Sequence, residues 1–173
     1  MTVVAETLRR EAIRPALEAL EPIIPWSQAA ENLVLGTAAH ESGGFVHRVQ
    51  TGAHGLGTGP ARGLFQMEQA TFRDLYDRYL GAHPALRRKV DTLWPNDGAD
   101  PWPHIETNDK FAAAMCRVRY WDSAAKIGFD PRDVFEMSRC WSQFYNTRRD
   151  PVLEAQFVAN FRRNVEDVPA HET

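Results

Sequence analysis

Cysteine and long apolar runs are scarce in this chain of 173 residues, which contains only two cysteines, Cys116 and Cys140. Neither belongs to a CxxC pair or to a Cys/His spacing typical of zinc sites, so we predict no metal centre. Two buried free thiols are the simplest expectation, with a disulfide as the alternative. No apolar stretch is long enough to span a membrane, and the N-terminus lacks the pattern of a signal peptide. We therefore expect a protein that is made in the cytoplasm and does not cross a membrane.

An excess of charge is also missing. The formal net charge is -3 and the pI is near 6.1, which gives no general electrostatic footprint for nucleic acid. The hydrophobic content of 43% is that of an ordinary globular protein, and the chain is long enough to bury one core. We therefore expect a single domain over residues 1–173, with no cofactor and no nucleic-acid partner.

The spacing of apolar residues predicts a mainly α-helical fold. The face of a first helix is marked by residues four positions apart: Leu8, Ala12, Ala16 and Leu20. A second helix is predicted from about Ser27 to Glu41, where Gly43-Gly44 provides a glycine stop. The segment from Gly43 to Gly63 holds seven of the eleven glycines, which predicts a loop or a small hairpin after this helix.

The rest of the chain also shows helical patterns. One begins near Glu68 and another runs from about Thr107 to Trp121. Two further helices are indicated by the pairs Asp130-Pro131 and Asp150-Pro151. In each pair a capping carboxylate precedes a proline that suits the first helical position.

Glu41 is the strongest candidate for a catalytic residue. It shares the apolar line of Val34 and Ala38 while lying in the last turn of its predicted helix. Burial by that face and the negative end of the helix dipole both disfavour a carboxylate, so its pKa should be raised. A carboxyl group that stays protonated near neutral pH suits the protonation of a leaving glycosidic oxygen.

Three segments carry a resemblance to a known family. Residues 40–45 read His-Glu-Ser-Gly-Gly-Phe, residues 63–67 read Gly-Leu-Phe-Gln-Met and residues 144–146 read Phe-Tyr-Asn. In this order they resemble the Glu-Ser, Gly-Leu-Met-Gln and Ala-Tyr-Asn motifs of the soluble lytic transglycosylase and goose-type lysozyme family. The resemblance covers about residues 27–147 and implies a lysozyme-like fold that cleaves the glycan strands of bacterial peptidoglycan.

The resemblance also implies roles for single residues. Glu41 would be the catalytic acid, and Ser42 next to it would belong to the same motif at the substrate site. Gln66 and the backbone around Phe65 would line the sugar cleft. Tyr145 would hydrogen-bond and orient Glu41, and Asn146 would brace the cleft wall.

One absence bears on the type of reaction. No Asp or Glu occurs between Ser42 and Met67, where a second carboxylate that activates water would be expected. Glu68 follows directly, but it precedes a predicted helix, where favourable interaction with the helix dipole is the simpler role. A mechanism with one acid fits better, because in lytic transglycosylases the substrate's own groups replace the second carboxylate and form a 1,6-anhydro product. His47 and His54 lack companions that would make a metal site.

Two alternatives remain open at this point. The string from His40 to Gly44 also resembles the His-Glu-Thr/Ser-Gly-Gly of family-19 chitinases and the phage endolysins related to them, which are hydrolases. A structural protein of a phage particle that has kept the fold and lost the activity is the second alternative. The lack of an export signal and of a wall-binding module favours a bacteriophage protein that acts in the cell wall, either carried in a virion with other phage proteins or released as an endolysin.

Overall fold

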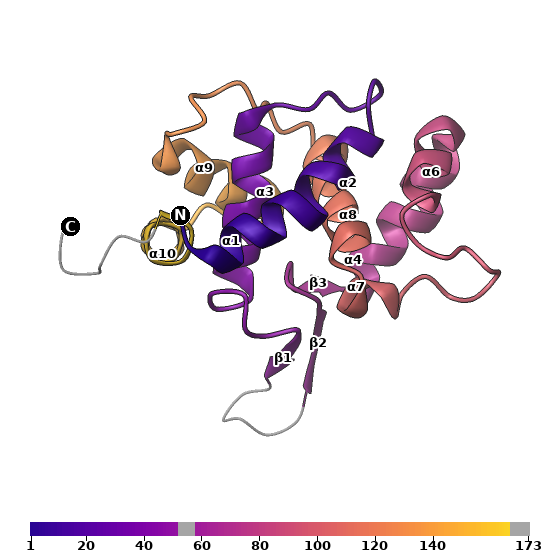
Figure 1. The fold of residues 1–173 in the computed structure, drawn as a ribbon, viewed down its shortest axis with the longest axis horizontal. Helices are drawn as coiled ribbons and strands as arrows, with labels where there is room; N and C mark the ends of the chain where they lie inside the picture. Colours follow the sequence, from indigo (N-terminus) through magenta and orange to yellow (C-terminus); the bar gives the residue numbers. More distant parts are fainter. Residues whose placement is uncertain (52–57, 167–173) are drawn as a thin grey trace.

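The computed structural model describes residues 1–51 and 58–166, and this part of the chain is mainly helical with a small antiparallel sheet (Figure 1). The first half contains α1 (Val3–Leu8), the π-helical η1 (Arg9–Ile13), α2 (Arg14–Ala19), α3 (Gln28–Glu41), β1 (Val49–Thr51), β2 (Thr58–Arg62) and β3 (Met67–Glu68). Next come α4 (Gln69–Arg73), η3 (Asp74–Tyr79), α5 (Leu80–Ala82), α6 (Pro84–Asp91) and α7 (His104–Thr107). The last elements are α8 (Asp109–Asp122), α9 (Val134–Cys140), η4 (Trp141–Tyr145), α10 (Pro151–Phe161) and η5 (Arg162–Glu166).

The helix α3 lies at the centre of the molecule and carries the segment of greatest interest (Figure 1). Ser27 caps its first turn, because the Ser27 hydroxyl accepts a hydrogen bond from the amide of Ala30 at 3.1 Å. Every residue from Leu33 to Ala39 is buried. A Cβ at Gly36 would approach the rings of Phe157 and Phe161 to 2.8 Å, so the missing side chain allows α10 to pack closely against α3. The predicted helix from Ser27 to Glu41 is confirmed.

The glycine-rich segment after α3 forms the predicted small hairpin, extended by a third short strand. The sheet has the order β1-β2-β3, with Val49 opposite Arg62 and Ala61 opposite Glu68. Gly63 ends β2 with a φ of +72°, and a Cβ there would lie 2.1 Å from the carbonyl oxygen of Ile105. The close approach that glycine permits fixes the end of this sheet against α7.

The two Asp-Pro pairs have different outcomes. Asp150 caps α10 by accepting from the amides of Val152 and Leu153, with Pro151 at the first helical position, as predicted. The prediction for Asp130-Pro131 is wrong, because α9 starts later and is capped by Asp133. Asp130 instead accepts from the amide of Arg132 at 2.8 Å and closes a short turn before the helix.

The core of the described residues contains few charged groups, and the buried carboxylate among them is paired. Glu31 on α3 is fully buried and forms ion pairs with Arg9 at 2.9 Å and Arg14 at 2.8 Å. The indole of Trp26 donates to the same carboxylate at 3.0 Å. This network joins α3 to the N-terminal helices. Burial acts to raise the pKa of Glu31, but hydrogen bonds from Arg14 and Trp26 together with the charge of Arg9 hold it below its usual value.

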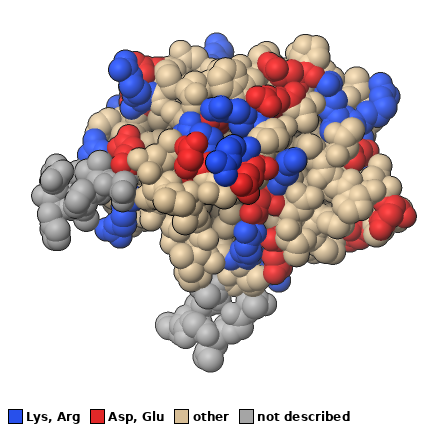
Figure 2. Space-filling model, in the orientation of Figure 1, with Lys and Arg blue, Asp and Glu red and all other residues tan. Residues whose placement is uncertain are grey.

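Cys116 and Cys140 are both buried and free, so the predicted pair of free thiols is confirmed. In the described residues, no helix combines the length and the apolar character that crossing a membrane requires. Basic and acidic side chains are interspersed on the face shown in Figure 2, which therefore presents no broad surface of one sign.

Candidate active site

A cleft of about 550 Å³ lies at the C-terminal end of α3. The sheet and the start of α4 contribute to its wall, together with α8 and the end of η4. Its lining residues are Glu41, His47, Gln50, Ala61, Gln66, Met67, Glu68, Thr71, Arg119, Tyr145, Asn146 and Thr147. The fold therefore brings to one cleft four of the residues that the motifs predicted, although they lie up to 105 positions apart in the sequence.

Glu41 occupies the last residue of α3 and is largely buried at the cleft. Burial raises the pKa of its carboxyl group from the ordinary 4.5 to about 7. A hydrogen bond from Trp141 and the positive charge of Arg119 act in the opposite direction, but they are smaller effects. The carboxyl group can therefore hold a proton near neutral pH and also lose it there, as a general acid and base must.

Trp141 is the hydrogen-bond partner of Glu41. Its indole Nε1 donates to Glu41 Oε1 at 2.9 Å, and its side chain is almost fully buried. The tryptophan begins the π-helical turn η4, and turns of this kind are frequent at functional sites. Sequence reasoning missed this residue, since no local pattern links positions 41 and 141.

The predicted hydrogen bond between Tyr145 and Glu41 is wrong. The Tyr145 hydroxyl donates instead to the backbone carbonyl of Phe65 at 2.7 Å. Tyr145 is buried with its ring 5.4 Å from that of Tyr120. It reaches the cleft wall, but its hydroxyl binds the backbone beside Gln66. The hydrogen bond to Glu41 comes from Trp141 instead.

Ser42 and Phe65 lie beside the cleft without lining it. The hydroxyl of Ser42 is buried, donates to the carbonyl of Ala38 at 2.6 Å and accepts from the amide of Phe45 at 2.7 Å. It therefore closes the end of α3. The prediction that Ser42 binds substrate is wrong, because its side chain does not line the cleft. The side chain of Phe65 belongs to the core, and its contribution is the carbonyl that Tyr145 binds.

Gln66 reaches the cleft from a turn with an unusual backbone, since its φ is +43°. Its side-chain amide donates to the carbonyl of Gly63 at 2.9 Å, which closes the turn between β2 and β3. The amide oxygen of Gln66 makes no hydrogen bond to the described residues, so it is available to a ligand hydroxyl.

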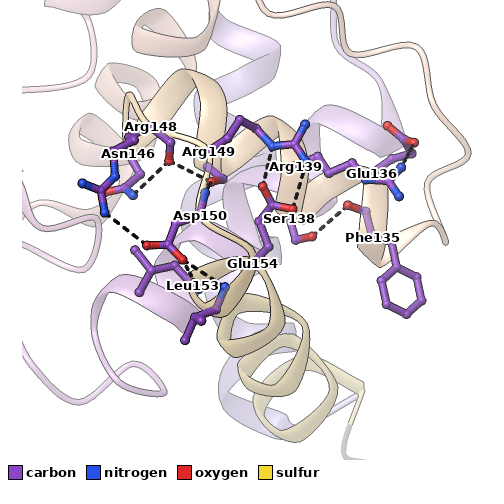
Figure 3. A network of polar contacts seen from close by, with 12 residues as sticks. Phe135, Glu136, Ser138, Arg139, Asn146, Arg148, Arg149, Asp150, Leu153 and Glu154 are labelled. Atoms are coloured by element: carbon purple, nitrogen blue, oxygen red, sulfur yellow. Dashed lines mark hydrogen bonds and ion pairs between the residues drawn. The ribbon is translucent and has the colours of Figure 1, made fainter.

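Asn146 lines the cleft at the end of η4 and begins a turn held by polar contacts (Figure 3). Its side-chain amide donates to the carbonyl of Arg148 at 3.5 Å, and Ser142 donates to the same carbonyl at 2.9 Å. Asp150 closes the turn by donating its amide to the hydroxyl of Ser142 at 3.0 Å. The predicted bracing of the wall by Asn146 agrees with this placement.

Glu68 is a second carboxylate in the same cleft. It directly precedes α4, as the sequence predicted, and its side chain makes no capping hydrogen bond to that helix. Glu68 is exposed and lines the cleft with Glu41. Its position follows from its pairing with Ala61 across the sheet, which composition alone does not show.

Arg119 supplies positive charge to the cleft. Its guanidinium lies 4.6 Å from the ring of Tyr145 and donates to the backbone carbonyl of that residue. His47 also lines the cleft, but within residues 1–51 and 58–166 no group of three metal-ligating side chains occurs. His54 lies outside the described residues.

In comparisons with known proteins, no protein-family model, no curated protein and no solved structure matches the chain, so the case for its function depends on its own residues.

Proposed function

We propose that this protein cleaves the MurNAc-GlcNAc bond in the glycan strands of peptidoglycan, with Glu41 as the general acid. The observation that carries the proposal is the largely buried carboxyl group of Glu41 at an open cleft, with its pKa raised to about 7. An acid of this kind is what protonation of a glycosidic oxygen needs. The amide of Gln66 and the polar side chain of Asn146 give sugar hydroxyls hydrogen-bond partners in the same cleft.

The arrangement of elements around the acid supports a lysozyme-like fold. The acid lies at the C-terminal end of a buried central helix, α3, and the small sheet that follows forms one wall of the cleft. The opposite side is formed by helical segments, of which η4 carries the Phe-Tyr-Asn motif. The three segments that resemble the lytic transglycosylase family thus meet around one cleft.

We favour a lytic transglycosylase mechanism. Glu41 first donates its proton to the leaving oxygen and the bond to the anomeric carbon breaks, with assistance from the substrate's own N-acetyl group. The resulting carboxylate then takes the proton of the C6 hydroxyl of the same sugar while that oxygen closes a 1,6-anhydro ring. The proton returns to Glu41, so the residue acts once as acid and once as base.

The presence of Glu68 in the cleft favours a second candidate, a hydrolase. A carboxylate across the substrate from the acid can activate water or stabilise the positive charge at the anomeric carbon. Glu68 is exposed, lines the same cleft and is not engaged in capping α4. This mechanism matches the alternative of an endolysin related to family-19 chitinases.

Digestion of purified peptidoglycan in water enriched in oxygen-18 separates the two reactions. A transglycosylase releases fragments that end in 1,6-anhydro-N-acetylmuramic acid and carry no label. A hydrolase releases reducing ends that carry the label at the anomeric carbon. Mass spectrometry of the soluble products distinguishes them directly.

Two variants make the comparison specific. Glu68→Gln should leave the rate of anhydro-product formation within a few-fold of wild type if Glu41 acts alone, and should abolish release if Glu68 serves the hydrolase. Glu6→Gln, an exposed residue on α1 away from the cleft, is the matched control. Labelled reducing ends as the main product would replace the transglycosylase proposal with the hydrolase. If neither wild type nor either variant releases product, the remaining alternative is a structural protein without catalytic activity.

A further inference from the structure

The contact between Trp141 and Glu41 distinguishes the two oxygens of the carboxyl group. The indole N–H can only donate a hydrogen bond, and it donates to Oε1 at 2.9 Å. We propose that Trp141 is a positioning residue that holds Oε1 as an acceptor and so keeps the acid proton of Glu41 on Oε2. This inference rests on the proposed function, in which Glu41 delivers that proton to the glycosidic oxygen.

The surroundings of the carboxyl group agree with this assignment. In a protonated carboxyl group the carbonyl oxygen is the better acceptor, so a fixed donor at Oε1 favours the proton on the other oxygen. Glu41 Oε2 makes no hydrogen bond to the described residues, and it is not one of their buried atoms that lack a partner. Since Glu41 lines the cleft, Oε2 is the oxygen that can reach a ligand there.

Trp141 is itself packed against two other aromatic rings. Its ring packs edge-on against His40 with centroids 4.3 Å apart, and it lies 5.5 Å from the ring of Phe157. His40 is fixed in turn by Asn160, whose side-chain amide lies 3.1 Å from Nδ1 of the imidazole. Burial lowers the pKa of His40 to about 4, so the imidazole stays neutral while Glu41 titrates. This packing restricts the orientation of the indole donor.

The titratable groups near Glu41 come from several elements. Arg119 and Cys116 reach it from α8, and Tyr145 does so from η4. Glu68 and His47 share its cleft from the side of the sheet. Among these, the positive charge of Arg119 lowers the pKa of Glu41, and the hydrogen bond from Trp141 lowers it as well.

Removing the indole N–H and removing the packing of the ring therefore have opposite effects. Loss of the N–H deprives the carboxylate of a donor, which raises the pKa of Glu41. Loss of the ring without other change admits water, which lowers that pKa toward its ordinary value. A purely structural role for Trp141 predicts the second effect or none.

The first experiment uses Trp141→Phe, which removes the donor and keeps an aromatic ring. Carbon-13 NMR of labelled glutamate side chains follows the ionisation of Glu41 without any substrate. The expected result is an increase of about one pH unit in its pKa, from the strength of a hydrogen bond to a charged group. Trp121→Phe, an indole half exposed at the end of α8, is the matched control and should leave this pKa unchanged. An unchanged or lowered pKa in Trp141→Phe would overturn the inference.

A second measurement keeps the core intact. In the wild-type protein labelled with nitrogen-15, the indole N–H signal of Trp141 should move with pH and show an inflection near the pKa of Glu41. The signal should lose that inflection in Glu41→Gln. An indole signal that titrates equally in both proteins, or in neither, contradicts the inference even if Trp141→Phe does not fold.

Both readouts are independent of activity, so they separate this inference from the proposed function. If the pair titrates together and no glycan is cut, the proposed function fails and the placement of the proton remains. If glycan is cut and the indole signal of Trp141 does not change as Glu41 ionises, only the positioning role is refuted and the proposed function stands. In an active enzyme, Trp141→Phe should also lower kcat at least about tenfold while moving the alkaline limb of the pH profile upward.

Discussion

Glu41→Gln should make the protein more stable at alkaline pH while destroying the acid. The amide has almost the same shape as the carboxyl group, and its oxygen can still accept the hydrogen bond from Trp141. Wild type must hold a negative charge in a largely buried position once the pH exceeds the pKa of Glu41, whereas the variant never does. The cost of that charge is therefore visible as a difference in stability.

The raised pKa gives the magnitude. Burial moves the pKa of Glu41 from 4.5 to about 7, and each pH unit corresponds to about 1.4 kcal/mol, so the full cost is about 3 kcal/mol. Between these two values the folded protein binds a proton that the unfolded chain has released, so wild type loses stability as the pH rises through this window. Below pH 4.5 the residue is neutral in both states and the cost disappears.

Urea denaturation of both proteins at pH 4 and pH 8 measures the effect. The stability of Glu41→Gln minus that of wild type should increase by about 3 kcal/mol between the two conditions, which corresponds to roughly 6 to 12 °C in Tm. Other titrating groups, including His40 and Glu31, are common to both proteins and cancel in the difference. Parallel pH profiles would mean that Glu41 ionises normally in the folded protein, and the reasoning about its burial would be refuted.

Three further changes test the support of the site. Tyr145→Phe should lower the free energy of unfolding in urea by about 1 to 3 kcal/mol, because the buried carbonyl of Phe65 loses its donor. The pKa of Glu41 should stay near 7 by NMR, and a shift of that pKa would indicate that Tyr145 does hydrogen-bond to Glu41. Gly63→Ala should cost at least about 2 kcal/mol, because a Cβ meets the carbonyl of Ile105 at a positive φ, and wild-type stability in denaturant would show that the turn is not constrained. Glu31→Gln should lower the free energy of unfolding by about 3 to 5 kcal/mol, because it leaves two buried or half-buried arginines unpaired. Wild type should lose this stabilisation as the pH falls below 4.5 and through the lowered pKa of Glu31, and equal stability of the two proteins at pH 7 would contradict the prediction.

Local patterns in the sequence predicted the elements that depend on local chemistry. The limits of α3 follow from a serine cap and a glycine stop, and both are present. The raised pKa of Glu41 follows from its place on the apolar face of that helix. Asp150 acts as a cap because the helix begins directly after it, whereas Asp130 does not because α9 begins at Val134 and is capped by Asp133.

The features that the sequence did not reveal depend on contacts between distant segments. The partner of Glu41 was expected to be Tyr145, but the π-helical turn places the indole of Trp141 at the acid and directs the tyrosine hydroxyl to Phe65. Glu68 enters the cleft because of the register of the sheet, which a glycine-rich stretch does not specify. Both corrections change the interpretation of the chemistry, and neither changes the proposal that Glu41 is the general acid.

The most direct test of the central claim is the release of soluble muropeptides from purified cell-wall sacculi, quantified by chromatography for wild type and Glu41→Gln. The stability measurements above show independently that the variant is folded. Wild type should release fragments between about pH 5 and 7, where Glu41 is still at least half protonated, and the variant should release less than about a thousandth as much. Equal release by the two proteins, or no release by wild type at any pH in this range, would contradict the assignment of Glu41 as the acid that cleaves the glycan.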